Sequence, residues 1–88
     1  MGRLTHVGGE IVRLKVGVSD EAAGTVGFEP VGMFYELGPG EYLYACLNEV
    51  QLRSLEVTSW SGGVSLWVRG EFVVLDSRGN VLDEIWGG

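Results

Sequence analysis

The sequence predicts a small all-β domain, an antiparallel sandwich or barrel of about six or seven short strands. Three observations support this fold class. Apolar segments recur at intervals of about ten residues. Several of them alternate apolar and polar side chains with the two-residue period of a half-buried strand. Glycine, at 15 of 88 residues, falls mostly between the apolar segments, where turns are expected. Nothing in the composition divides residues 1–88 into two domains.

The first predicted strand covers residues 10–18. Valine and leucine side chains alternate there with Arg13 and Lys15, so one face of the strand is expected to be buried and the other solvated. Residues 19–27 are rich in small and turn-forming types and are predicted to be a turn. A single helical turn within them would end at Gly24.

Two further strands are predicted around a tight turn. Residues 31–37 alternate in the manner of a strand, and Gly38-Pro39-Gly40 suits a turn in which Gly40 takes a positive φ. Residues 41–47 are largely apolar on both faces. A strand that is apolar on both faces is expected in the interior of its sheet.

Residues 48–55 allow two interpretations. Asn48 followed three positions later by Gln51 resembles a capping box, which would begin a short helix. A strand with a bulge at Ser54 would explain the shift in apolar periodicity equally well. The bulged strand is preferred.

The remaining third of the chain is predicted to be extended. Residues 55–60 form a strand and 61–63 a turn. The clearest segment, 64–75, is predicted to be one long strand interrupted by a glycine. A hairpin loop at 76–80 then leads into a last strand at 81–86.

The charge balance argues against several classes of function. Six Lys and Arg stand against twelve Asp and Glu, a formal net charge of −6. Nucleic-acid binding and attachment to anionic membranes both draw on clustered cations, so neither is expected. A basic or neutral partner is expected instead. With one cysteine, and no apolar run of signal-peptide or membrane-spanning length, the chain is expected to be cytoplasmic or part of a particle assembled inside the cell.

Catalytic and metal-binding groups are sparse. His6 is the only histidine and Cys46 the only cysteine, and the thiol lies among apolar neighbours as an inert buried side chain would. The adjacent acids Asp20-Glu21 and Asp83-Glu84 lack the spacing of a calcium loop. We therefore predict no enzyme activity, no metal site and no cofactor.

The large aromatic side chains are the most informative feature for function. Trp67 has the opposite parity to the apolar stripe of segment 64–75, so both faces of that segment are partly apolar. Either the monomer covers both faces, or an exposed patch docks a partner; Trp and Arg are enriched at such contact sites. The residues predicted to form the contact site are Trp67, Arg69, Val73 and Leu75, followed by Trp60 and Trp86.

The preferred hypothesis is a non-enzymatic interaction module that binds another protein, or copies of itself, through a sheet face or by strand addition at a sheet edge. An assembly subunit, including a homo-oligomer, fits this hypothesis, and so does an acidic inhibitor or immunity-type protein that blocks a basic partner.

The alternative depends on the C-terminus, Ile85-Trp86-Gly87-Gly88. This ending resembles that of ubiquitin-like sulfur carriers and modifiers. The resemblance implies a β-grasp fold, with a clear helix after the first hairpin, and activation of the terminal Gly88 as an adenylate or thiocarboxylate.

Overall fold

The protein is a two-layer β-sandwich with one short helix. The computed structural model describes residues 10–86. Its elements are β1 (Val12–Gly17), β2 (Gly24–Glu29), β3 (Met33–Leu37), β4 (Tyr42–Leu47), α1 (Glu49–Ser54), β5 (Glu56–Trp60), β6 (Gly63–Trp67), β7 (Phe72–Leu75) and β8 (Val81–Ile85). The all-β prediction is confirmed, with eight strands among the described residues instead of six or seven.

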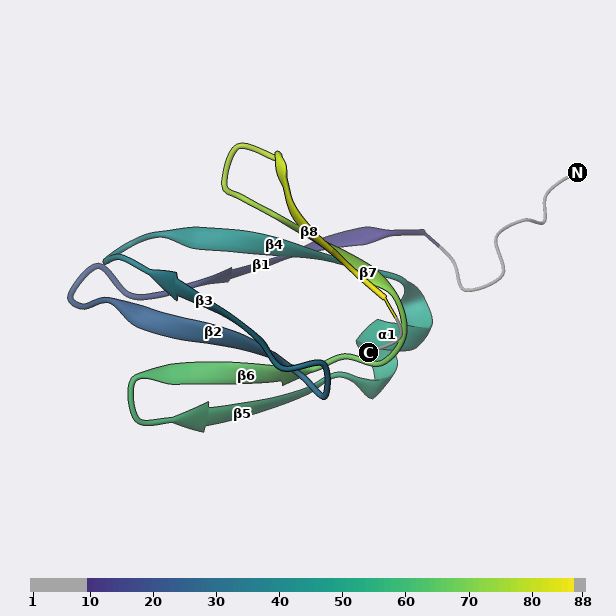
Figure 1. Cartoon of the computed structure of the whole chain (residues 1–88), viewed down its shortest axis with the longest axis horizontal. Helices are drawn as coiled ribbons and strands as arrows, with labels where there is room; N and C mark the ends of the chain where they lie inside the picture. The colour runs from purple at the N-terminus through teal and green to yellow at the C-terminus, as the bar shows by residue number, and fades with distance from the viewer. Residues whose placement is uncertain (1–9, 87–88) are drawn as a thin grey trace, which may run out of the picture.

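Each layer is a sheet of four strands (Figure 1). Sheet A has the order β1-β4-β7-β8, and sheet B has the order β3-β2-β6-β5. Every neighbouring pair is antiparallel except β2 and β6, which are parallel. The predicted antiparallel arrangement holds for every neighbouring pair but this one. A parallel neighbour requires a long connection, and here the chain passes through sheet A and α1 before it returns to sheet B.

The core lies between the inner faces of the two sheets. Phe28 of sheet B is fully buried and packs against Phe72 of sheet A, with ring centroids 5.3 Å apart. Beside these rings, both sheets contribute fully buried aliphatic side chains, which include Val26, Leu43, Leu47 and Val74. The position of β4 between β1 and β7 confirms that residues 41–47 lie in the interior of a sheet.

The turn predicted at residues 19–27 is wrong for its second half, because β2 begins at Gly24. Val26 and Phe28 have no exposed surface, and β2 pairs on one side with β3 and on the other with β6. The glycines that suggest a turn are explained by close packing, which leaves little space for a side chain. A Cβ atom at Gly24 would lie 2.9 Å from a methyl carbon of Val18.

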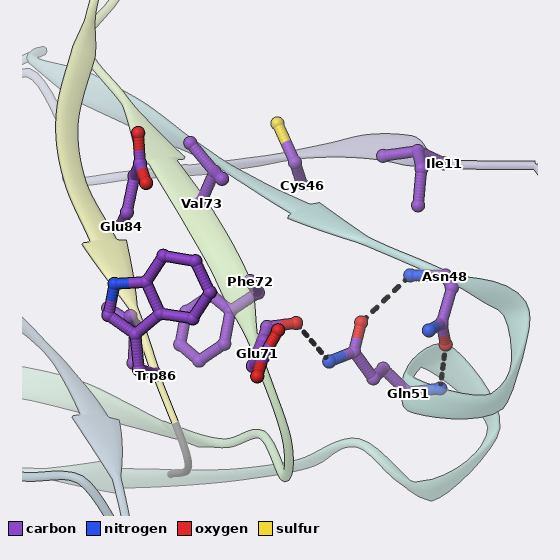
Figure 2. Close-up of a pocket in the computed structure, with 10 residues that line it drawn as sticks. Ile11, Cys46, Asn48, Gln51, Glu71, Phe72, Val73, Glu84 and Trp86 are labelled. Atoms are coloured by element: carbon purple, nitrogen blue, oxygen red, sulfur yellow. Dashed lines mark hydrogen bonds between the residues drawn. The ribbon is translucent and has the colours of Figure 1, made fainter.

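The single long strand predicted at residues 64–75 is also wrong. The segment is divided into β6 in sheet B and β7 in sheet A. We call the connecting residues, 68–71, the crossover. Gly70 has a φ of +84° in it, which breaks the extended conformation. The side chain of Gln51 holds the crossover, because its Nε2 atom donates hydrogen bonds of 2.9 Å to the carbonyl oxygens of both Arg69 and Glu71. Figure 2 shows the bond to Glu71.

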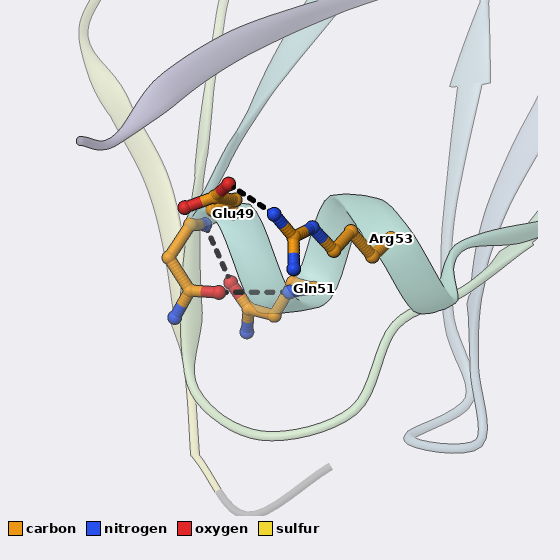
Figure 3. Close-up of polar contacts among 4 residues, drawn as sticks. Glu49, Gln51 and Arg53 are labelled. Carbon is orange, nitrogen blue, oxygen red and sulfur yellow. Dashed lines mark hydrogen bonds and ion pairs between the residues drawn. The ribbon is translucent and has the colours of Figure 1, made fainter. Parts of the chain in front are cut away.

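The helix α1 corrects the preference for a bulged strand at residues 48–55. Asn48 accepts a hydrogen bond of 2.8 Å at Oδ1 from the backbone N–H of Gln51, and the Gln51 side chain accepts one of 2.9 Å from the backbone N–H of Asn48 (Figure 2). This is the capping box that the sequence left as the alternative. Glu49 and Arg53 add an ion pair of 2.6 Å along the helix (Figure 3).

The turns that the sequence predicts elsewhere are confirmed. Gly40, Gly62 and Gly79 have φ values between +75° and +90°, a region that glycine enters without steric cost. Among residues 10–86, no helix has both the length and the apolar composition needed to cross a bilayer.

Candidate functional site

The outer face of sheet B carries three large aromatic side chains. Phe34 on β3, Trp60 on β5 and Trp67 on β6 have exposed fractions of 52%, 42% and 42%. The register places each of them at an outward position, alternating along its strand with inward residues such as Tyr35 on β3 and Leu66 on β6. We call the outer face of sheet B, with these three side chains on it, the aromatic face.

Two of the rings lie over glycines of the neighbouring strand. Phe34 is the register partner of Gly27, and Trp60 is the partner of Gly63. A Cβ atom at Gly27 would lie 2.6 Å from Cδ1 of Phe34, and one at Gly63 would lie 2.7 Å from Cζ2 of Trp60. The Nε1 atom of Trp60 also donates a hydrogen bond of 2.9 Å to Oγ of Ser65. The absence of side chains at these two glycines therefore lets the rings rest on the sheet in defined positions.

The third aromatic residue, Trp67, lies between two glutamates in the strand register. Its register partner on β2 is Glu29, and its partner on β5 is Glu56. Side chains of register partners on one sheet face have their Cβ atoms about 5 Å apart. Trp67 is thus the centre of a row of three outward residues, which we call the Glu-Trp-Glu row.

The aromatic face is acidic. The four strands of sheet B contain Glu29, Glu36 and Glu56, all at outward positions, and they contain no lysine or arginine. In the part of the chain that the structure describes, the only ion pair joins Arg53 to Glu49. The carboxylates of the aromatic face consequently have no cationic partner among residues 10–86.

The outer face of sheet A has a different chemistry. The Nζ atom of Lys15 lies 4.1 Å from the centroid of the Tyr42 ring, and Cζ of Arg13 lies 5.9 Å from the centroid of the Tyr44 ring. Cations of the chain itself therefore cover the tyrosines of sheet A. Within the described residues, no such contact is found on the three rings of the aromatic face.

The residues that the sequence predicts as a contact site are distributed over both sides of the sandwich. Trp60 and Trp67 lie on the aromatic face. Arg69 is exposed and belongs to the crossover. Val73 and Leu75 are on β7 in sheet A, where Leu75 is only 6% exposed. The structure does not bring these five residues together on one face, because the crossover carries the chain from one sheet to the other.

The sixth residue, Trp86, is 68% exposed and follows β8. Together with Val73 it borders a cleft of about 250 Å³ at the α1 end of sheet A. In Figure 2, Trp86 lies at one side of this cleft and Gln51 at the other. The lone thiol, Cys46, also lines the cleft and is half-buried, where the sequence predicted a buried side chain.

Sequence analysis missed Phe34, Glu29 and Glu56 as site residues. Their place on the face follows from strand register, which pairs Phe34 with a glycine in a segment predicted to be a turn. The signal that could have found them is the alternation of Gly27 and Glu29 with buried apolar residues in β2.

Residues 10–86 contain no group of three or more His, Cys, Asp or Glu side chains that could hold a metal ion. His6 and the Gly87-Gly88 end, which figured in the catalytic and sulfur-carrier hypotheses, lie outside the described residues. Comparison of the chain with protein-family models, with curated proteins and with solved structures gave no match.

Proposed function

We propose that the protein is a non-enzymatic interaction module that docks a protein partner on the aromatic face. The observation that supports this most directly is the placement of Phe34 and Trp60 over glycines, which keeps large apolar rings on the surface in defined positions. Rings that are already positioned lose little conformational freedom on binding, and pre-organisation of this kind improves affinity.

The exposed apolar surface of the aromatic face, and the binding energy that it can supply, also favour a docking site. An exposed cluster of large apolar side chains on a small domain usually marks a contact site. Tryptophan is among the residue types that contribute most binding energy at such sites. Trp60 and Trp67 come from adjacent strands of one sheet, so a single partner surface can cover both.

The proposal is tested with a variant of the face and a matched control. The test variant combines Phe34→Ser with Trp67→Ser. The control combines Val81→Ser with Leu82→Ser, which removes two exposed apolar side chains from β8 in sheet A. A partner is first captured from extract of the native cell, then purified and titrated against each variant by calorimetry. Light scattering at several protein concentrations detects binding to a second copy.

We expect the face variant to lose at least about thirtyfold in affinity, corresponding to roughly 2 kcal/mol at a tryptophan hot spot. The control is expected to bind as the unaltered protein does, and both variants should remain folded and unfold cooperatively on heating. Equal binding by the face variant and the control would refute the proposal.

A further inference from the structure

We propose that the Glu-Trp-Glu row binds an arginine side chain of the protein partner, with the guanidinium stacked on Trp67 between Glu29 and Glu56. This inference rests on the proposed function, and it names the group that the aromatic face recognises. It depends on three features of the row: an exposed indole, a carboxylate on each neighbouring strand, and the lack of a cationic partner for either carboxylate among residues 10–86.

An indole ring is the aromatic surface that attracts a cation most strongly, through its negative face. Trp67 is 42% exposed at an outward position, so part of its surface is open to a ligand. The register partners of Trp67 place Glu29 on one side of the indole and Glu56 on the other. A cation over the ring would thus meet negative charge on both flanks.

This geometry favours arginine over lysine. A guanidinium is planar and weakly hydrated, and its donors point outward in one plane. When it lies flat on the indole, its opposite edges can donate charge-assisted hydrogen bonds to carboxylates on two sides. A lysine ammonium is compact and strongly hydrated. A lysine ammonium would therefore lose more hydration than a guanidinium does when it binds on the indole ring.

The arginines among residues 10–86 form no ion pair with Glu29 or Glu56 and no stacking contact with Trp67. Arg53 is paired with Glu49 on α1. Arg69 follows Trp67 by two residues, yet it forms no ion pair with a described carboxylate and no stacking contact with Trp67. On sheet A, by contrast, Arg13 and Lys15 do stack on tyrosines, so the chain itself shows cations on aromatic rings.

The test uses a blocked peptide, Gly-Ser-Arg-Ser-Gly, at low salt. It is titrated into the full chain labelled with ¹⁵N, and the indole N–H signal of Trp67 is assigned with Trp67→Phe. Two comparison peptides carry lysine or citrulline in place of arginine; citrulline keeps the shape of arginine and lacks the charge. We expect the arginine peptide to shift the indole N–H signal of Trp67 and the backbone amide signals of Glu29 and Glu56. It should also bind at least about tenfold more tightly than the citrulline peptide.

Variants localise the effect. Glu29→Gln combined with Glu56→Gln is expected to weaken binding of the arginine peptide at least about tenfold. Glu36→Gln is the matched control, because Glu36 is on the same face and pairs with Thr25 instead of Trp67. It should bind as the unaltered chain does. Arg69→Ala should also bind with unchanged affinity, whereas a large gain would show that Arg69 occupies the row and would overturn the proposal.

Failure of this inference can be separated from failure of the proposed function. If the Glu29→Gln, Glu56→Gln variant binds the protein partner normally while the Phe34→Ser, Trp67→Ser variant does not, the arginine site is refuted and the docking face stands. If the latter variant also binds the partner normally, the proposed function itself fails. Equal binding of the arginine and citrulline peptides would likewise refute the arginine site.

Discussion

Tyr35 of sheet B donates a hydrogen bond of 2.8 Å from its hydroxyl to Oδ2 of Asp83 in sheet A. Both side chains are half-buried, and their register partners, Val26 and Val74, are core residues. The bond therefore joins the two sheets on their inner sides. Burial is the main cause that raises the pKa of Tyr35, and the hydrogen bond to Asp83 and its negative charge raise the pKa further.

The raised pKa of Tyr35 predicts a loss of stability in alkali. The folded protein holds the phenolic proton more tightly than the unfolded chain, in which the pKa is near 10.0. The contribution of Tyr35 is therefore complete below pH 10.0 and decreases as the pH rises above it. In urea unfolding, Tyr35→Phe should show a smaller decrease over that range than the unaltered protein. Tyr44→Phe, which leaves the bond intact, is the control; an identical decrease in both variants would contradict the prediction.

We predict that loss of the Gln51 side chain, which releases the crossover, lowers the free energy of unfolding. Its side chain is 8% exposed and bonds the carbonyls of Arg69 and Glu71 as well as the N–H of Asn48. Gln51→Ala would leave these groups without that partner, and we expect the free energy of unfolding to fall by about 2 kcal/mol. Ser54→Ala, an exposed position on the same helix, should change it far less.

Gln51→Glu sharpens this test. It replaces the donor with a carboxylate oxygen that faces two carbonyl oxygens. The charged form is disfavoured in the folded protein, so the pKa of the introduced carboxyl should rise above its usual value of about 4.3. Stability should be lost as the pH rises through that raised value and should partly recover on acidification. Urea unfolding of this variant without any such recovery would show that the donor at Nε2 does not hold the crossover.

We predict that alanine substitutions at the two glycines beneath the rings destabilise the fold by unequal amounts. Gly27→Ala would place its Cβ atom against the ring of Phe34, and the added methyl group can displace this half-exposed ring from its position on the sheet without moving the backbone. Gly63→Ala would place its Cβ atom 2.5 Å from the backbone oxygen of Thr25, which cannot move without disturbing the sheet. We expect Gly63→Ala to lower the thermal unfolding midpoint more than Gly27→Ala does.

The Gly27 effect can be assigned to the ring by a double-mutant cycle. In the background Phe34→Ala, the added methyl group of Gly27→Ala no longer meets the ring. The cost of Gly27→Ala should then be smaller than in the unaltered chain, a coupling that is expected between residues in contact. Strictly additive unfolding free energies would show that the ring does not rest on Gly27.

We predict that the hairpin loop at residues 76–80 is less stable in acid, because the carboxylate of Asp76 holds it. Its Oδ1 atom accepts hydrogen bonds of 2.9 Å from the backbone N–H groups of Asn80 and Arg78. These bonds, that from Asn80 first, lower the pKa of Asp76 below 3.8. The stabilisation is complete above pH 3.8 and is lost as the pH falls through the lower folded value. Amide NMR signals of Arg78 and Asn80 should shift over that range, and Asp76→Asn should abolish the shift while Glu84→Gln preserves it.

Much of the fold could be predicted from alternation alone, since alternation reports which side chains face the core. Leu66 and Phe72 belong to the apolar stripe of segment 64–75, and both are buried. Alternation does not report the sheet to which a residue belongs. The two sheets share one core, so a segment can leave one and enter the other with its apolar side chains still pointing inward. The crossover between β6 and β7 was missed for this reason.

The other errors have local causes. The six residues of α1 are too few for helical periodicity to show, although Asn48 and Gln51 carried the capping signal. In β2, the glycines suggested a turn. The structure instead explains them by close packing, of Val18 against Gly24 and of Phe34 against Gly27, which the sequence of β2 does not reveal. For the candidate site, the sequence allowed an exposed Trp67 as one of two alternatives, and the Glu-Trp-Glu row depends on register between strands far apart in sequence.

The parallel pairing of β2 with β6 has a consequence for the speed of folding. Thr25 and Gly63 are partners in this ladder although 38 positions (63 − 25) separate them in the chain. Closing so long a loop costs conformational entropy before any bond of the ladder forms, and non-local pairings of this kind slow folding to the millisecond-to-second range. Until this ladder forms, Leu66 on β6 lacks its register partner on β2, Phe28.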